Sequence, residues 1–330
     1  MMTGHKIRNS RCAFAEAMTI EEGVDRVLRQ CLAVRKGENV LVVADLERRV
    51  VGEAFFQGVK RVEAVPVLSF IHPLEKASPE PPSHLSSFML ECDAIIMATG
   101  TSMTHTKARQ RASRAGARIA SLPGVTEESL SEGGLTADYE EIARLLRILD
   151  RKLRNCKKVH VVSGKGTDLT FSVKGRVWIT QDNGLAEHKS DFVTLPAGEI
   201  FVSPAEGSGE GRLVFDARLH DIVEQPATVI LKEGYVAKVN GAKDAVAQMN
   251  KGGKDGRNFA KFGFGLNPRT RAQGPIAEAQ KTLGCAHLAF GGSVPFGGKV
   301  VCDVRVDGIM RDVTIDFDGK VLLERGKLLI

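Results

Sequence analysis

Residues 39–45 read NVLVVAD, an uninterrupted apolar run that is typical of a β-strand buried on both faces of a parallel sheet. Before this run, residues 20–35 carry apolar side chains at helical spacing. After it, helical patterns alternate with three more apolar runs, at 64–71, 92–100 and 117–124. Strands that alternate with helices at this pitch indicate right-handed crossovers. The pattern therefore predicts an α/β domain built on a doubly wound parallel sheet.

The rest of the chain follows a different pattern. After residue 155, short β-like runs are separated by glycine turns, and only 242–251 and 274–283 look helical. These features predict a mixed, largely antiparallel α+β domain over 156–330. A chain of 330 residues also exceeds what one hydrophobic core usually serves. We therefore expect a tail at 1–19, the parallel-sheet domain at 20–155 and the α+β domain after it.

The composition excludes several classes of protein and partner. Hydrophobic residues make up 43% and charged residues 26% of the chain, as in ordinary soluble globular proteins. The net charge of +6 is spread over both halves, and no aromatic side chain interleaves with the basic residues of 107–118, so we expect no nucleic-acid partner. No apolar stretch reaches the roughly 18 residues that span a bilayer, and the N-terminus lacks the apolar core of a signal peptide. Six scattered cysteines indicate reduced thiols, so we expect a cytoplasmic protein without membrane contact.

Several polar residues of the second half stand where a partner is required. Glu199 follows a Pro-Ala-Gly turn and lies between apolar residues. His287 lies in the glycine-flanked apolar stretch LGCAHLAFGG, where it is either a core histidine with a satisfied ring or a metal ligand. In DVRVDG, the side chains of Asp303, Arg305 and Asp307 alternate onto one side of a strand. A carboxylate on the inward side needs a cation, which is a metal ion or an arginine.

Six motifs follow one another along the chain: TADYEEIARLL (136–146), KGTDLTFSVKGR (165–176), LPAGEIFVSPAEGSGEG (195–211), FGFGLNP (262–268), LGCAHLAFGG (283–292) and VDG (306–308). Their order resembles that of the aminopeptidase T family of thermophilic metalloproteases. A ring-cleaving branch, similar to 2,5-dihydroxypyridine dioxygenase, shares this scaffold. The resemblance covers most of the chain after residue 20, and it implies a homodimer built around an internal cavity.

The resemblance also implies a metal site. In the peptidases of this family, two metal ions are held by two glutamates, a histidine and a His-x-Asp pair, with a tyrosine nearby. Carried over residue by residue, Glu199 matches the first glutamate, His287 the lone histidine and Asp307 the aspartate of the pair. These three residues are the predicted metal ligands, for a divalent zinc, cobalt or iron ion that is bound weakly or not at all.

Three positions depart from the family pattern. Arg305 stands where the histidine of the His-x-Asp pair is expected, and Val294 stands in place of the tyrosine. The segment 259–267, where the second glutamate belongs, contains no carboxylate and places Lys261 and Phe264 there instead. Since an arginine does not ligate a metal, we predict that Arg305 pairs with one of the carboxylates of the site, Glu199 or Asp307, when no metal is bound.

Three functions remain open. The first is a metal-dependent hydrolase of aminopeptidase type, in which a metal-bound water attacks a peptide or small-molecule substrate and Arg305 orients a carboxylate or stabilises an oxyanion. The second is a non-haem iron dioxygenase, or an otherwise altered enzyme, that acts on aromatic or heterocyclic substrates. The third is a non-catalytic relative that binds a small molecule or a partner.

Overall fold

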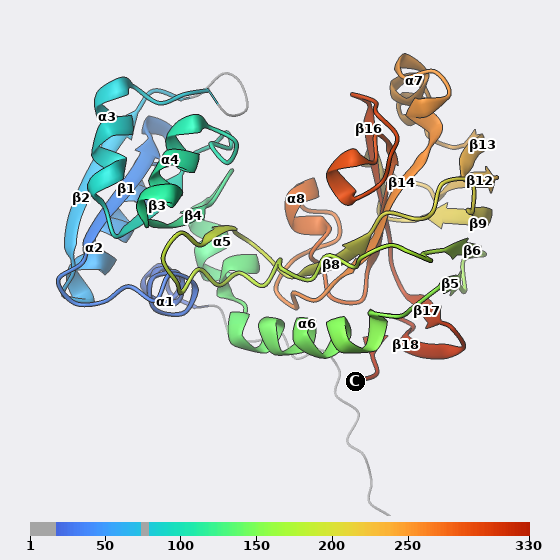
Figure 1. Cartoon of the computed structure of the whole chain (residues 1–330), viewed down its shortest axis with the longest axis horizontal. Coiled ribbons are helices and arrows are strands. Elements are labelled where there is room, and N and C mark those ends of the chain that lie inside the picture. Colours follow the sequence, from blue (N-terminus) through green and yellow to red (C-terminus); the bar gives the residue numbers. More distant parts are fainter. Residues whose placement is uncertain (1–17, 74–78) are drawn as a thin grey trace, which may run out of the picture.

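The computed structural model describes residues 18–73 and 79–330. Figure 1 shows two halves that are joined along one side by the long helix α6 (Tyr139–Leu153). The N-terminal half holds a parallel sheet between helices, and the C-terminal half holds two antiparallel sheets. The predicted fold class is confirmed. Most of the predicted N-terminal tail, up to residue 17, lies outside the described residues, and no helix of the described part is long and apolar enough to cross a membrane.

The parallel sheet has five strands in the order β2-β1-β3-β4-β7. They are β1 (Asn39–Asp45), β2 (Val65–Ile71), β3 (Ala94–Ala98), β4 (Arg118–Ser121) and β7 (Phe192–Thr194). All four neighbouring pairs run parallel. The fifth strand comes from a segment that the sequence pattern assigned to the second domain, so the parallel sheet is completed from beyond residue 155.

Helices cover both faces of this sheet, which explains the unbroken apolar run of β1. Val40, Val42 and Ala44 belong to the core that includes the helices α1 and α2, whereas Leu41 and Val43 belong to the core of α3 and α4. The helices are α1 (Ile20–Arg26, continued by a π-helical turn over Val27–Cys31), α2 (Arg49–Arg61), α3 (Ser83–Phe88) and α4 (Lys107–Ala115). Successive side chains of a strand point to opposite faces, so a strand covered on both sides cannot alternate in polarity.

The C-terminal half contains a six-stranded and an eight-stranded antiparallel sheet. The order of the first is β11-β10-β16-β15-β14-β8 and that of the second is β13-β12-β9-β6-β5-β17-β18-β19. The six strands are β8 (Glu199–Val202), β10 (Arg218–Leu219), β11 (Asp221–Ile222), β14 (Phe259–Gly265), β15 (Ala286–Gly291) and β16 (Arg305–Met310). The eight are β5 (Lys158–Ser163), β6 (Asp168–Ser172), β9 (Glu210–Phe215), β12 (Ala227–Lys232), β13 (Tyr235–Asn240), β17 (Val313–Phe317), β18 (Lys320–Glu324) and β19 (Lys327–Leu328).

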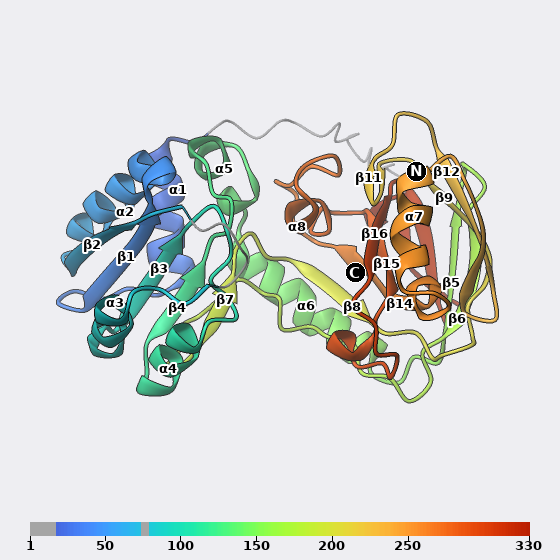
Figure 2. The ribbon, with the colours of Figure 1, turned by 90° about the horizontal axis from the view of Figure 1, so that it is seen from above.

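Phenylalanines fill the space between these two sheets. The ring of Phe171 in the eight-stranded sheet lies 4.9 Å from that of Phe262 in β14, and Phe215 lies 6.2 Å from Phe290 in β15. One face of the six-stranded sheet is therefore committed to this core. The opposite face looks toward the N-terminal half, and Figure 2 shows the short helix α8 (Ile276–Ala279) on that side. Of the two predicted helices of this half, α7 (Lys243–Lys251) forms nearly as expected and α8 is much shorter than 274–283.

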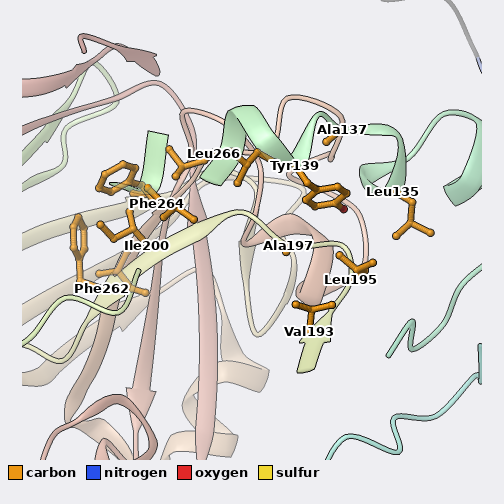
Figure 3. Packing of buried hydrophobic residues seen from close by; sticks show 14 of the residues in the cluster. Leu135, Ala137, Tyr139, Val193, Leu195, Ala197, Ile200, Phe262, Phe264 and Leu266 are labelled. Carbon is orange, nitrogen blue, oxygen red and sulfur yellow. The ribbon is translucent and has the colours of Figure 1, made fainter. Parts of the chain in front are cut away.

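A continuous apolar cluster joins the two halves. Figure 3 shows Leu135, Tyr139, Leu195 and Ala197 packed in a row that leads to Ile200 at the edge of the antiparallel core. The segment that links β7 to β8 spans four residues, so β8 begins where the parallel sheet ends. This short connection places the first residue of β8, Glu199, at the junction of the two halves.

Candidate functional site

A pocket of about 640 Å³ lies between the two halves. One wall is formed by the loops that follow β3, β4 and β7, at the carboxyl edge of the parallel sheet, where open α/β sheets commonly bind ligands. The other wall comes from α8 and β16. The polar side chains of the lining are Ser102, Thr104, His105, Ser129, Thr194, Glu278, Gln280, Lys281, Arg305 and Asp307.

The charged wall belongs to the free face of the six-stranded sheet. Gly263 of β14 pairs with Phe201 on one side and with His287 on the other, and Gly265 pairs with Glu199. Paired residues of adjacent strands point to the same face, so the side chains of Glu199, Lys261 and His287 share one face, opposite the phenylalanine core. Asp307 and Arg305 of β16 join the same face through their register with β15.

Glu199 is buried, and each of its carboxylate oxygens accepts a hydrogen bond from a lysine ammonium group. Oε2 accepts a hydrogen bond from Lys261 Nζ at 2.8 Å, and Oε1 accepts one from Lys281 Nζ at 2.5 Å. His287 Nε2 lies 2.9 Å from the same Oε2, in a direction that does not make a well-aligned hydrogen bond. Burial favours a raised pKa for Glu199, but the charges of Lys261 and Lys281 outweigh it and hold the pKa well below its usual range.

The two lysines differ in their surroundings. Lys261 is buried, and its ammonium lies 4.2 Å from the ring centre of Phe201. Burial lowers the pKa of Lys261 and the attraction of Glu199 opposes this shift. Lys281 lines the pocket and also binds Asp182, at 2.8 Å. Burial acts to lower the pKa of Lys281, but the two carboxylates outweigh burial and raise it.

Local backbone contacts explain how Lys281 reaches Glu199. Asn267 N donates to the carbonyl of Lys281 at 2.8 Å, and bridges tie Gly265 to Leu283. A Cβ at Gly265 would lie 2.2 Å from the carbonyl carbon of Lys281, so the close approach of this segment requires a glycine. Asp182 fixes the other side, because its Oδ2 accepts hydrogen bonds from the amides of Gly198 and Glu199 as well as binding Lys281.

His287 is fully buried and neutral at ordinary pH. Burial, with repulsion from Lys261, lowers its pKa to about 4. Within the described part of the chain, Nδ1 has no hydrogen-bond partner, and Nε2 has only the poorly aligned contact with Glu199 Oε2. The ring packs over Gly263, where a Cβ would lie 2.6 Å from Nε2. His287 is therefore a neutral imidazole at the edge of a charged cluster, with Glu199 as its polar neighbour.

Asp307 does not contact Glu199 directly and is linked to the cluster around it through Gln280, whose Oε1 lies 3.5 Å from Lys261 Nζ. Arg305 binds it through Nε and Nη2 at 2.8–3.0 Å, and Gln280 Nε2 donates to its Oδ1 at 2.8 Å. The predicted ion pair of Arg305 is thus confirmed, with Asp307 and not with Glu199 as the partner. The guanidinium lies 5.2 Å from the ring centre of Phe296, and its Nη1 makes no hydrogen bond with the described residues.

The side chains as they stand do not fit a metal ion. Among the predicted ligands, Glu199 and His287 meet, but Asp307 is bound by Arg305 and Gln280 instead. Within 18–73 and 79–330, no group of three or more His, Cys, Asp or Glu side chains is placed to hold an ion. The positions beside Glu199 that a cation would take are filled by ammonium groups. Glu199 requires a cation as the sequence predicts, and lysine provides it.

Sequence reasoning did not identify Asp182, Gln280 or Lys281. Asp182 comes from an irregular segment, which carries no periodic pattern, whereas Gln280 and Lys281 fall in the predicted helix 274–283, which ends at Ala279 and leaves Gln280 as its C-cap. Lys261 departs from the family pattern, but the sequence does not reveal that it is the cation beside Glu199. The one available signal was the buried carboxylate itself, since such a group needs positive charge from somewhere in the chain. Val294, at the position of the family's tyrosine, is exposed and has no polar group to contribute to the site.

Comparisons with known proteins were consistent with this fold. The family model of NicX, 2,5-dihydroxypyridine 5,6-dioxygenase, matches residues 20–330. The 2,5-dihydroxypyridine 5,6-dioxygenase of Pseudomonas putida is 24% identical over an alignment of 221 positions, which covers 58% of this chain and 62% of that relative. The matched part is therefore less than two thirds of the relative's length.

Two solved structures share the fold. The 2,5-dihydroxypyridine dioxygenase from Pseudomonas putida KT2440 has a TM-score of 0.73 at 17% identity, over 94% of this chain and 96% of that one. AmpT from Thermus thermophilus has a TM-score of 0.63 at 18% identity, over 94% of this chain and 99% of that one. At such identities the likeness establishes the scaffold and leaves the chemistry to the residues of the site.

Proposed function

The chain belongs to the family of NicX, 2,5-dihydroxypyridine 5,6-dioxygenase, and we propose that it is an altered enzyme of this family, which takes a small hydroxylated aromatic or heterocyclic compound into the pocket between its halves. The motifs had suggested a peptidase family with a ring-cleaving branch. The family match instead places the chain with the ring-cleaving branch. The chain shares only the scaffold with the aminopeptidase.

The pocket is the observation that carries this proposal. Its volume of about 640 Å³ suits a ligand of one or two rings, and it lies at the carboxyl edge of the parallel sheet. Pro123, Val125, Leu135, Leu195 and Ile276 supply apolar lining for a ring. Hydroxyl groups and two cations supply hydrogen bonds for its polar substituents.

Arg305 and Lys281 give the pocket its preference for an anionic oxygen. Arg305 keeps Nη1 available while Asp307 holds the rest of the guanidinium in place. Its side chain is 47% exposed, so a ligand reaches it without breaking the pair. A phenolate or enolate oxygen bound here meets fixed positive charge, which stabilises the anion of a hydroxylated ring. The proposal assigns no role to a metal ion, because the donor set does not fit one.

Calorimetric titration with 2,5-dihydroxypyridine and with hydroquinone tests the proposal. We expect at least one of them to bind the wild type, and Arg305→Gln to bind it about ten- to a hundredfold more weakly, as for loss of a hydrogen bond to a charged group. Arg311→Gln is the matched control, because Arg311 is similarly exposed and ion-paired, to Asp216, but lies outside the pocket. No binding of either ring compound, or equal losses in both variants, would refute the proposal.

A metal-dependent hydrolase of aminopeptidase type is the second candidate, and the scaffold shared with AmpT favours it. It requires a metal-activated water, for which Glu199, His287 and Asp307 are not arranged. Oxygen consumption and product spectra with ring compounds, run beside the release of nitroaniline from leucine p-nitroanilide, separate the two activities. Binding of a ring compound without turnover in either assay would identify a non-catalytic relative.

A further inference from the structure

The charges of the side-chain cluster around Glu199 balance one another. Two carboxylates, Glu199 and Asp182, face two ammonium groups, those of Lys261 and Lys281, while His287 stays neutral. A dication added to this set would leave two positive charges uncompensated in a buried site, where such an imbalance is strongly unfavourable. A metal ion can therefore enter only if a lysine leaves.

The geometry shows which lysine occupies the ion's place. Oε2 of Glu199 is approached both by His287 Nε2, at 2.9 Å, and by Lys261 Nζ, at 2.8 Å. A cation shared by this carboxylate and this imidazole would have to contact the same oxygen and would meet the ammonium there. Lys261 cannot swing away easily, because it is buried on the interior strand β14 and enclosed by the rings of Phe201 and Phe296.

We propose that Lys261, supported by Lys281, is a built-in cation that takes the place of a divalent metal ion at Glu199. The strand register supplies the other parts of a metal site: a buried carboxylate, an imidazole whose Nε2 lies 2.9 Å from that carboxylate, and a glycine that lets them meet. The inference goes beyond the proposed function and does not depend on which ring compound the pocket binds. A single charge reversal, Lys261→Glu, is then sufficient to convert the cluster into a site for zinc or cobalt.

The test is calorimetric titration of zinc chloride into wild type, Lys261→Glu and the double variant Lys261→Glu/His287→Ala, each dialysed against chelator. We expect Lys261→Glu to bind zinc at least about a hundredfold more tightly than wild type, since a fixed positive charge is replaced by a ligand. The double variant loses the gain, because the imidazole is the single nitrogen donor. With Co²⁺, Lys261→Glu gains visible absorption bands that the other two proteins lack. Lys36→Glu, on the exposed surface, is the control and behaves as wild type.

Lys261→Met covers the case in which Lys261→Glu does not fold even with zinc. It removes the ammonium without adding a carboxylate and keeps an unbranched side chain. We expect zinc to raise the thermal unfolding midpoint of Lys261→Met and to leave that of wild type unchanged. The inference is overturned if wild type holds zinc stoichiometrically through His287. It is equally overturned if folded Lys261→Glu binds no better than wild type, or if zinc affects Lys261→Met and wild type alike.

Discussion

The imidazole of His287 is buried beside two ammonium groups, so the ring is kept neutral while the carboxylate next to it is kept charged. Both effects follow from the surroundings: burial and Lys261 disfavour a second charge on His287, and the lysines favour the charge of Glu199. A histidine whose pKa is lower in the folded protein than in the unfolded chain makes stability depend on pH. The unfolded chain binds this proton at a higher pH than the folded protein does, so lowering the pH favours unfolding.

We predict that stability falls as the pH is lowered from 6.5 to 4. The unfolded chain protonates His287 near its ordinary pKa of 6.5, whereas the folded protein does so only near 4. Between these values the proton favours the unfolded state, by up to roughly 3 kcal/mol in total. Urea unfolding at pH 7, 5.5 and 4.5 measures the effect. His287→Gln should flatten the decline over this range and the exposed His84→Gln should not; identical pH profiles for all three proteins would contradict the assignment.

The residues of the site were predictable to different degrees. Glu199, His287 and Arg305 stand out because a polar residue in an apolar or alternating stretch needs a partner, and the pairing of Arg305 follows from its spacing to Asp307. The cation at Glu199 was not predictable. Lys261 and Lys281 lie 62 and 82 residues further along the chain, and they reach one carboxylate only through the register of β14 and the packing of the segment after α8 against it.

At the scale of elements, the strand β14 organises the site. It lies between β8 and β15, and its glycines bear no side chain on the face where Glu199 and His287 meet. Phe262 and Phe264 point to the other face and anchor the strand in the phenylalanine core. The alternation of phenylalanine and glycine in β14 therefore separates a packed face from a face left open for charged side chains.

Gly263→Ala tests this role of β14. An added Cβ would lie 2.3 Å from the carbonyl oxygen of Ile200 and 2.4 Å from Cε1 of His287, so either the strand or the ring must move. We predict a loss of about 1–3 kcal/mol in the free energy of unfolding, as for overpacking in a core. Gly164→Ala serves as control, because nothing lies within 4 Å of its new Cβ. Urea unfolding of both variants measures the change in the free energy of unfolding. An undiminished stability of Gly263→Ala would show that β14 tolerates side chains on this face.

The same strand shows where prediction of elements from sequence stops. β1 to β4 are apolar runs with helices between them, so their existence and order follow from local pattern. β14 and β15 lack clean alternation because glycines interrupt them, so the sequence pattern does not predict them as strands. RVWIT at 176–180, which reads as a strand, forms only an isolated bridge from Ile179 to Phe201. The three residues of β7 are too few to be recognised, and their place beside β4 depends on the whole fold.

At the scale of the whole molecule, we propose a homodimer, as the resemblance to the aminopeptidase T family implies. Among the described residues, the most exposed large apolar side chains are those of Val301, at 80%, and Val177, at 76%. Val177 follows Arg176, which donates to the carbonyl of Gly297 and so holds this segment against the one that leads to Val301. Light scattering at micromolar concentration should give about twice the 35.7 kDa of one chain. A mass that stays at that of a single chain across the accessible concentrations would contradict the prediction.

We expect the two halves of one chain to unfold as a single unit. β7 completes the parallel sheet from beyond the first helix-rich region, and the chain then enters β8 after four residues. Leu195, in that link, is buried in the core that also holds Tyr139 and Ile200, so neither half closes its core without the other. Leu195→Ala should therefore lower the stability of both halves together, by about 2–5 kcal/mol for a large-to-small change in a core.

Two local probes read the halves separately in the same denaturant series. Trp178, the single tryptophan, reports the C-terminal half by fluorescence, and hydrogen exchange at the amides of 39–45 reports the parallel sheet. For wild type we expect coincident transitions, and for Leu195→Ala a shift of both to the same lower midpoint. If the exchange of 39–45 changes while the Trp178 transition keeps its midpoint, the halves are separate folding units. The pocket between them would then open by hinge motion instead of being held by a shared core.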